Sequence, residues 1–276
     1  MDVGCRPYFE RKSGLTMKSP YILSFLSVAA VCLGLSLPIS AQDADAPAKE
    51  ASKPKTSHFA PVKDTEAQLK YYIQKIGKDL ADKSEYSEAQ IKRVGLDAST
   101  VSVLAFTLAI HDKESKLKPA ASKLMTLATE VAENAEEFDA AKEAHDQLSA
   151  AFAKPEKGEA VALDEPVADL AMLMQQVPIV NAGLRKGVDD KRRFARNVKR
   201  TAPKAVTLAA IANASMMDTN YCSDEDDEKA WQAICADMRD ACADVYKALM
   251  KKDQAAAKKA NQRVVETCDA CHDKFR

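Results

Sequence analysis

The sequence has little of what builds β-strands and rigid turns. Only 6% of the 276 residues are aromatic, and the chain holds 8 glycines and 11 prolines. No run of strand length alternates β-branched residues with polar ones. Alanine, lysine, glutamate and leucine are abundant instead, and these residues lose little conformational freedom in a helix. Composition and pattern together predict an all-α protein.

The sequence also lacks an excess of charge of either sign. Its formal net charge is −1, so no long-range field favours nucleic acid, and we expect no nucleic-acid partner. It offers no Ser-His-Asp triad, phosphate-binding loop or pair of carboxylates placed for acid–base chemistry. We therefore expect a protein that is not an enzyme.

The N-terminus has the pattern of a signal peptide. Lys18 precedes an uncharged apolar run over 21–37, and Ala41 ends a short segment typical of a cleavage site. A transmembrane anchor is the alternative, but the run is short and polar residues follow it. The sequence thus predicts a signal peptide over 1–41, a periplasmic location and no membrane span after its removal. A flexible linker over 42–63, rich in alanine, lysine and proline, is expected next.

Beyond residue 63 the apolar residues recur with the period of a helix. A charged, proline-containing stretch over 154–166 divides this region into two groups. The predicted helices span 64–82, 86–112, 117–135 and 136–153 in the first group, and 167–187 (interrupted at Pro178), 190–217, 227–251 and 253–275 in the second. The two outlines match, which predicts two tandem antiparallel four-helix bundles. The first (64–153) would be a degenerate repeat of the second (167–276).

The chemistry-bearing motif is Cys268-Asp269-Ala270-Cys271-His272, the C-x-x-C-H spacing of covalent haem attachment. Two thiols three residues apart lie on one face of a helix and can bond to one edge of a porphyrin. The adjacent imidazole can then bind the iron. The sequence therefore predicts one covalent haem c. The first group has no cysteine, since none occurs between residues 33 and 221.

Two other interpretations of the cysteine pair are open. A thioredoxin-like dithiol needs a strand–helix context, for which the sequence has no pattern. A zinc site needs a second pair of ligands, such as another C-x-x-C, which the chain lacks. Both are disfavoured relative to haem.

Four helices closed by the terminal pattern C-x-x-C-H-D-x-F-R resemble the cytochrome c′ family, the class II c-type cytochromes. The resemblance covers about 167–276. It implies a left-handed bundle with the haem between helices, His272 as the proximal iron ligand, and Phe275 and Arg276 beside the proximal pocket. The additional helices at 64–153 depart from the family's usual single domain.

The resemblance also implies that the first helix of the bundle faces the sixth iron position. Met172 or Met174 could supply a thioether there, or both could merely fill the core. We expect an open or weakly occupied site. The expected function is single-electron transfer with a periplasmic redox partner protein, small-gas (NO, CO) binding, or both, and a homodimer is compatible with it. The alternative is a non-redox helical interaction module whose haem is structural or vestigial.

The remaining candidates have ordinary structural interpretations. Cys235 and Cys242 lie on or beside an apolar stripe and are expected to be buried, and Cys222 lies in a loop with its pairing open. Trp231 is expected in the core, His145 as a half-buried, hydrogen-bonded side chain, and His58 and His111 at the surface. The basic run over 186–200 is either a solvated helix face, which we favour, or a docking patch for an acidic redox partner.

Overall fold

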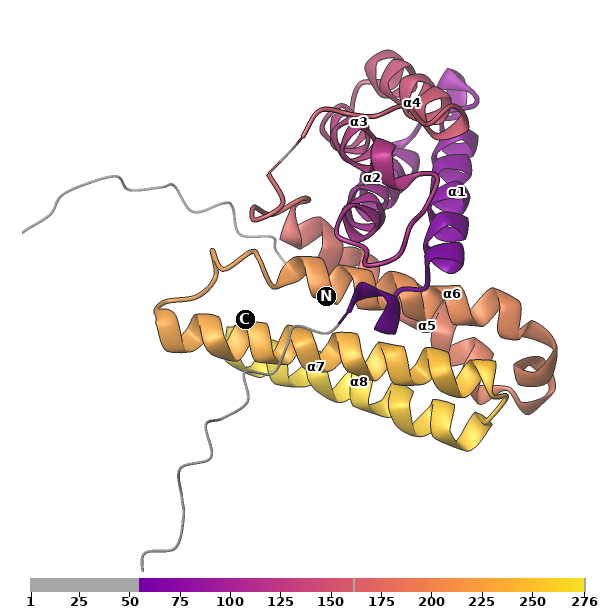
Figure 1. Ribbon diagram of the computed structural model, residues 1–276. Coiled ribbons are helices and arrows are strands. Elements are labelled where there is room, and N and C mark those ends of the chain that lie inside the picture. The colour runs from indigo at the N-terminus through magenta and orange to yellow at the C-terminus, as the bar shows by residue number, and fades with distance from the viewer. Residues whose placement is uncertain (1–54, 161, 276) are drawn as a thin grey trace, which may run out of the picture. The chain divides into compact units, whose positions relative to one another are not determined.

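The computed structural model describes residues 55–160 and 162–275 (Figure 1). Every regular element in these ranges is helical, and no strand occurs in them. The all-α prediction is confirmed. The predicted signal peptide (1–41), the first part of the predicted linker (42–54) and Arg276 lie outside the described residues.

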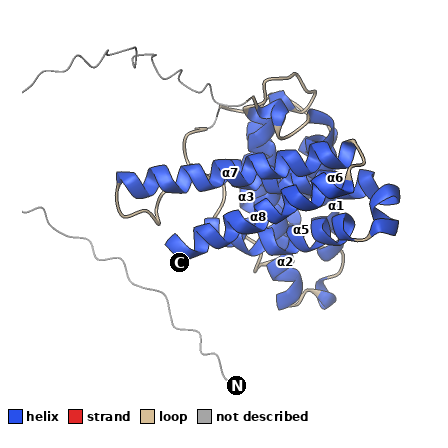
Figure 2. Ribbon diagram, turned by 90° about the horizontal axis from the view of Figure 1, so that it is seen from below, coloured by secondary structure: helices blue, strands red, loops and turns tan. Residues whose placement is uncertain are grey.

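Eight α-helices account for most of the described chain (Figures 1 and 2). They are α1 (Val62–Asp79), α2 (Glu88–Ala109), α3 (Ala121–Glu133), α4 (Phe138–Ala153), α5 (Leu170–Asp189), α6 (Lys191–Ser215), α7 (Glu225–Met250) and α8 (Gln254–Phe275). Each lies where the hydrophobic period predicts a helix, with ends shifted by a few residues. Local capping explains several of the ends. Asp169 and Asp224 accept a backbone hydrogen bond at the starts of α5 and α7, and Ser87 and Gln90 form a capping box on α2.

The predicted interruption at Pro178 is wrong, because α5 continues through this residue. A proline inside a helix removes one backbone hydrogen bond. Pro178 is exposed, and water can replace the lost partner there. The local departure from helical geometry falls instead at Asn197 of α6, with φ −114° and ψ 16°.

Helices that follow one another in the chain pack together. Within the first group, α1 and α3 each contact both α2 and α4. Within the second group, α5 and α7 each contact both α6 and α8. The groups also touch, since α2 packs against α5 and α6, and α1 against α6. One apolar core contains residues of all eight helices. The described residues accordingly form one compact unit.

The segment before α1 is packed, whereas its composition predicts a flexible linker as far as residue 63. Phe59 is 2% exposed and Ala60 is fully buried. The Arg239 guanidinium lies 5.5 Å from the centroid of the Phe59 ring. A single aromatic residue in a proline-containing stretch produces no periodicity, so sequence pattern could not reveal this contact.

His111 is buried, and the expectation that it would be exposed is wrong. Its Nδ1 accepts a hydrogen bond from the Lys113 amide at 2.8 Å, which leaves Nε2–H to donate to the Ala60 carbonyl at 2.8 Å. His145 is also buried, with Nε2 2.9 Å from the Ile73 carbonyl oxygen. The hydrogen bond predicted for His145 is present at Nε2, but the side chain is buried where half-burial was expected, and Nδ1 has no hydrogen-bond partner.

Within the ranges that the structure describes, no helix combines the length and the apolar character needed to cross a bilayer.

The close approach of α5 and α6 depends on Gly187. A Cβ atom at this position would lie 2.3 Å from Thr201 Oγ1 and 2.5 Å from Thr201 Cγ2, and Thr201 is buried. We expect Gly187→Ala to lower the free energy of unfolding by about 1–3 kcal/mol, the usual effect of overpacking, measured by urea denaturation.

Gly183→Ala, four residues earlier on α5, is the matched control for this prediction. Its Cβ would meet only the flexible end of Lys204, with the closest atom at 3.0 Å. Because alanine also has the better helix propensity, this variant is expected to be neutral or slightly stabilising. Equal destabilisation by both substitutions would contradict the proposed close approach.

Candidate functional site

The C-x-x-C-H motif lies in the last two turns of α8. Val264 is buried, and Cys268, Cys271 and Phe275 are half-buried, as expected for one stripe of a helix. His272 lies beside this stripe and is exposed. The helix thus directs both thiols toward its neighbours and leaves the imidazole at the surface.

A small apolar cluster surrounds the end of α8 and is separate from the main core. Its buried members are Leu170, Trp231 and Cys235. Met174, Met216, Cys222, Cys271 and Phe275 pack against them. These residues come from the start of α5, the loop that follows α6, the first half of α7 and the end of α8. We refer to this set as the motif cluster.

Trp231 fixes the motif cluster in place. It is 3% exposed, and its Nε1–H donates to the Ser215 carbonyl at 2.7 Å. Its ring meets that of Phe275 edge to face, with centroids 5.4 Å apart. The prediction of Trp231 as a core residue is confirmed, and its partners hold the end of α8 against α6 and α7.

An ion pair fastens the same end of α8 to the start of α7. Lys274 Nζ lies 3.0 Å from Asp227 Oδ1. The hydrogen bond from Lys274, with others from Ser223, lowers the pKa of the Asp227 carboxyl. Asp227 also belongs to the acidic first turn of α7, whose negative charges complement the helix dipole.

The environment of the two motif thiols suppresses their ionisation. Burial raises the pKa of Cys271, and burial together with the neighbouring Cys271 and Asp269 raises the pKa of Cys268. Dithiol redox centres need the opposite, a thiolate stabilised by positive charge or by a helix N-terminus. These cysteines instead lie at a helix C-terminus. The site geometry therefore gives no support to a thioredoxin-like dithiol.

The other cysteines behave as small apolar residues. Cys235 and Cys242 are buried, as predicted, and burial raises the pKa of Cys235 to about 12. The five described cysteines are all free thiols. Over residues 55–160 and 162–275, no group of three or more His, Cys, Asp or Glu side chains is arranged to hold a metal ion.

The two candidate distal methionines lie on different sides of α5. Met174 packs against the motif cluster. A Cβ placed on Gly95 of α2 would lie 2.7 Å from the terminal methyl of Met172, so that side chain reaches toward α2. The structure brings Met174, and not Met172, together with Cys271. Helical period alone does not determine the rotation of α5, so the sequence pattern could not separate the two methionines.

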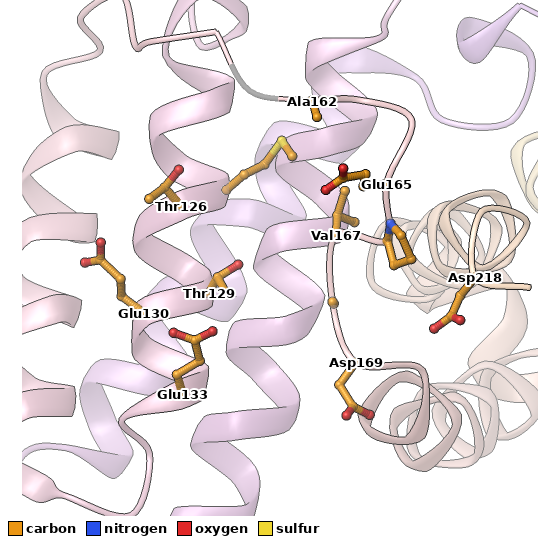
Figure 3. A pocket seen from close by; sticks show the side chains of 12 residues that line it. Thr126, Thr129, Glu130, Glu133, Ala162, Glu165, Val167, Asp169 and Asp218 are labelled. Carbon is orange, nitrogen blue, oxygen red and sulfur yellow. The ribbon is translucent and has the colours of Figure 1, made fainter. Parts of the chain in front are cut away.

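Two cavities lie away from the motif. One, of about 680 Å³, separates α3 from the segment before α5 and is lined by Glu130, Glu133, Glu165, Asp169 and Asp218, among others (Figure 3). Two of these carboxylates already have structural partners, since Asp169 caps α5 and Asp218 accepts from Asn220. The other cavity, of about 690 Å³, is lined by residues of α2, the α3–α4 connection and Met172.

Comparisons of this chain with protein-family models, with curated proteins and with solved structures gave no match.

Proposed function

We propose that the chain carries one haem, bound covalently through Cys268 and Cys271, and acts as a c-type cytochrome. The observation that carries this proposal is the setting of the motif. Cys271 packs into a separate apolar cluster built where α5, α6, α7 and α8 end or begin. An apolar wall beside paired thiols and an imidazole suits a flat, largely apolar porphyrin.

The residues present fit the donor set of a c-type haem. Cys268 and Cys271 lie on one face of α8, with thiols kept neutral by burial. His272 follows directly, and its imidazole is exposed, so it would be accessible to a bound iron. When bound, haem supplies a one-electron couple and an axial position for a small gas. Trp231, Leu170 and Phe275 would exclude water from it, which favours the less charged iron state.

We further propose that the fold is a tandem duplication of a four-helix bundle, with 64–153 as the haem-free copy. The same cycle of contacts, each helix with the next and the first with the last, occurs in α1–α4 and in α5–α8. Aligning Phe152 with Phe275 places His145 at the position of Cys268 and Leu148 at that of Cys271. His145 bonds to a backbone carbonyl of its own group, a role in stability and not in haem binding.

The proposal also requires export of the chain, because c-type haem is attached outside the bacterial cytoplasmic membrane. A signal peptide over 1–41 would deliver the chain to the periplasm, where it would exchange electrons with a redox partner protein or bind NO or CO.

The direct test is the mass and colour of the mature protein. We expect a polypeptide heavier by one haem, iron at one atom per chain, and haem staining that survives denaturing electrophoresis. One haem is expected because residues 64–153 contain no cysteine. Release of the porphyrin by acid–acetone extraction would refute covalent attachment, and two haems per chain would refute the haem-free copy.

A second measurement concerns the sixth iron position. We expect an open or weakly occupied site, with a high-spin ferric spectrum and rapid CO binding by the ferrous form. If a methionine does bind the iron, its charge-transfer band should be lost in Met174→Ala and kept in Met172→Ala, because Met174, and not Met172, packs against the cluster that Cys271 also contacts. Loss of the band in Met172→Ala alone would contradict this arrangement.

A further inference from the structure

Outside the motif, positive charge gathers where α5 turns into α6. Six basic side chains in this turn are exposed: Arg185, Lys186, Lys191, Arg192, Arg196 and Lys199. Asp189 and Asp190 are the carboxylates of the same turn. Further along α6, Lys204 has its pKa lowered by burial and by the charges of Arg200 and Lys75. The local potential is therefore positive although the whole chain is nearly neutral.

A second basic turn lies beside the first. The Gln254 side chain donates to the Val188 carbonyl at 2.7 Å, which joins the α7–α8 turn to the α5–α6 turn. Both turns are seen at the same end of α5–α8 in Figure 1. Lys251, Lys252, Lys258 and Lys259 are exposed here, with Asp253 capping α8. We call these two turns, with their ten exposed lysines and arginines, the basic end.

The α7–α8 turn has two unusual features. Met250, directly before the lysines, is 56% exposed. Lys252 adopts φ 56°, the left-handed conformation that glycine takes at least cost after a helix. Backbone hydrogen bonds from Lys252 to Leu249 and from Asp253 to Ala248 close the turn around it. The turn thus presents an apolar side chain flanked by cations, and uses lysine where glycine would be less strained.

The basic end is remote from the motif. Cys268 lies 14 residues along α8 from Gln254, which corresponds to about 21 Å at 1.5 Å per residue. Figure 2 shows the C-terminus at the opposite end of α8 from this turn. With haem at the motif, a surface at this distance would be poorly placed to exchange electrons with it, which disfavours the docking of a redox partner at the basic end. Single-stranded nucleic acid is disfavoured, because base stacking needs exposed aromatic side chains and Phe194, the aromatic residue of 185–200, is buried.

We propose that the basic end binds the surface of a bilayer rich in anionic phospholipid, with Met250 entering the headgroup region. Lysines and arginines spread over two turns match a diffuse negative surface. An apolar side chain among them adds contact with the acyl boundary. Bound in this way, the chain would hold the motif end of α8 away from the lipid. The exclusion of a redox partner here rests on the proposed haem, but vesicle binding does not require haem and is tested separately from it.

The test is sedimentation of the mature protein with vesicles of phosphatidylglycerol and phosphatidylcholine, against vesicles of phosphatidylcholine alone. We expect binding to the anionic vesicles at low salt and its loss at about 1 M salt, where the Debye length is about 3 Å. The triple variant Arg192→Glu, Arg196→Glu, Lys199→Glu should bind at least about a hundredfold more weakly, given the usual contribution of each basic residue.

The matched control reverses three exposed lysines on α1, α2 and α3: Lys78→Glu, Lys92→Glu and Lys123→Glu. It changes the net charge equally and should keep most of the binding. Circular dichroism checks that both triple variants remain helical. Absence of binding to anionic vesicles, equal losses in the two triple variants, or equally strong binding to double-stranded DNA would each overturn the proposal.

Met250→Trp tests the insertion step. Trp231 is buried, so the added tryptophan should dominate any response to lipid. Its emission is expected to shift to the blue when anionic vesicles are added. Unchanged emission from vesicle-bound protein would show that Met250 stays in water, and would overturn this part of the proposal.

Discussion

Replacing both Cys268 and Cys271 by alanine is expected to abolish covalent haem attachment completely. Each thioether needs one of these thiols, and the two lie three residues apart on one half-buried face of α8. The readouts are haem staining after denaturing electrophoresis and the mass of the mature chain. Because the variant loses two small half-buried groups, it should keep its helical circular dichroism.

The matched control is Cys235→Ala combined with Cys242→Ala. These cysteines lie on α7 and are more deeply buried than the motif pair, so this variant is expected to lose stability without losing attachment. Loss of haem in the control with retention in Cys268→Ala, Cys271→Ala would place the attachment site elsewhere and refute the proposal.

His272→Ala separates attachment from iron binding. His272 is exposed and its side chain takes no part in the motif cluster, so its removal should leave both thioethers in place. The expected result is a stained band of unchanged intensity with an altered absorption spectrum. An unaltered spectrum would show that another residue is the proximal ligand.

Lys75→Met is expected to lower the free energy of unfolding by roughly 3 kcal/mol near neutral pH, the scale found when one member of a buried ion pair is removed. Asp97 of α2 is fully buried, and Lys75 Nζ of α1 lies 2.8 Å from its Oδ2. Gln176 of α5 donates to Oδ1 at 3.2 Å. Without Lys75, the carboxylate would keep one hydrogen bond, from Gln176, and would lose the cation in direct contact with it.

The loss caused by Lys75→Met should depend on pH in a defined direction. Burial raises the pKa of Asp97 above its ordinary 3.8, and Lys75 and Gln176 partly oppose this rise. For a carboxyl whose pKa is raised by folding, stability is present below the unfolded pKa and is lost as pH rises through the folded pKa. Removing Lys75 raises that pKa further. The difference between wild type and variant should therefore be largest near neutral pH and shrink as the solution is acidified.

Denaturant titrations at several pH values measure this difference. Lys78→Met, an exposed position on the same helix, should leave stability unchanged. Adding Asp97→Asn to Lys75→Met should restore part of the loss, because an amide needs no counter-charge. A deficit that is constant from pH 4 to pH 7, with no rescue by Asp97→Asn, would show that the Asp97 charge is not its cause.

The sequence by itself determined the helices and the motif, because both depend on residues near one another in the chain. A period of 3.6 residues selects helices whatever their neighbours are, and all eight are found near their predicted ranges. The spacing of Cys268, Cys271 and His272 puts their side chains on adjoining faces of a single helix. Cys235, Cys242 and Trp231 could be assigned to the interior for the same reason, since each falls on the apolar side of a periodic segment.

The contacts between distant segments were decided only by the tertiary structure. Helical period does not fix the rotation of α5, which directs Met174 to the motif cluster and Met172 to Gly95. The burial of Phe59 and His111 depends on Arg239 and Ala60, partners that local pattern does not specify. The basic end joins two turns more than sixty residues apart, through the bond from Gln254 to Val188. Local propensity acts over a few residues, whereas burial and electrostatics act between surfaces that exist only after the chain has folded.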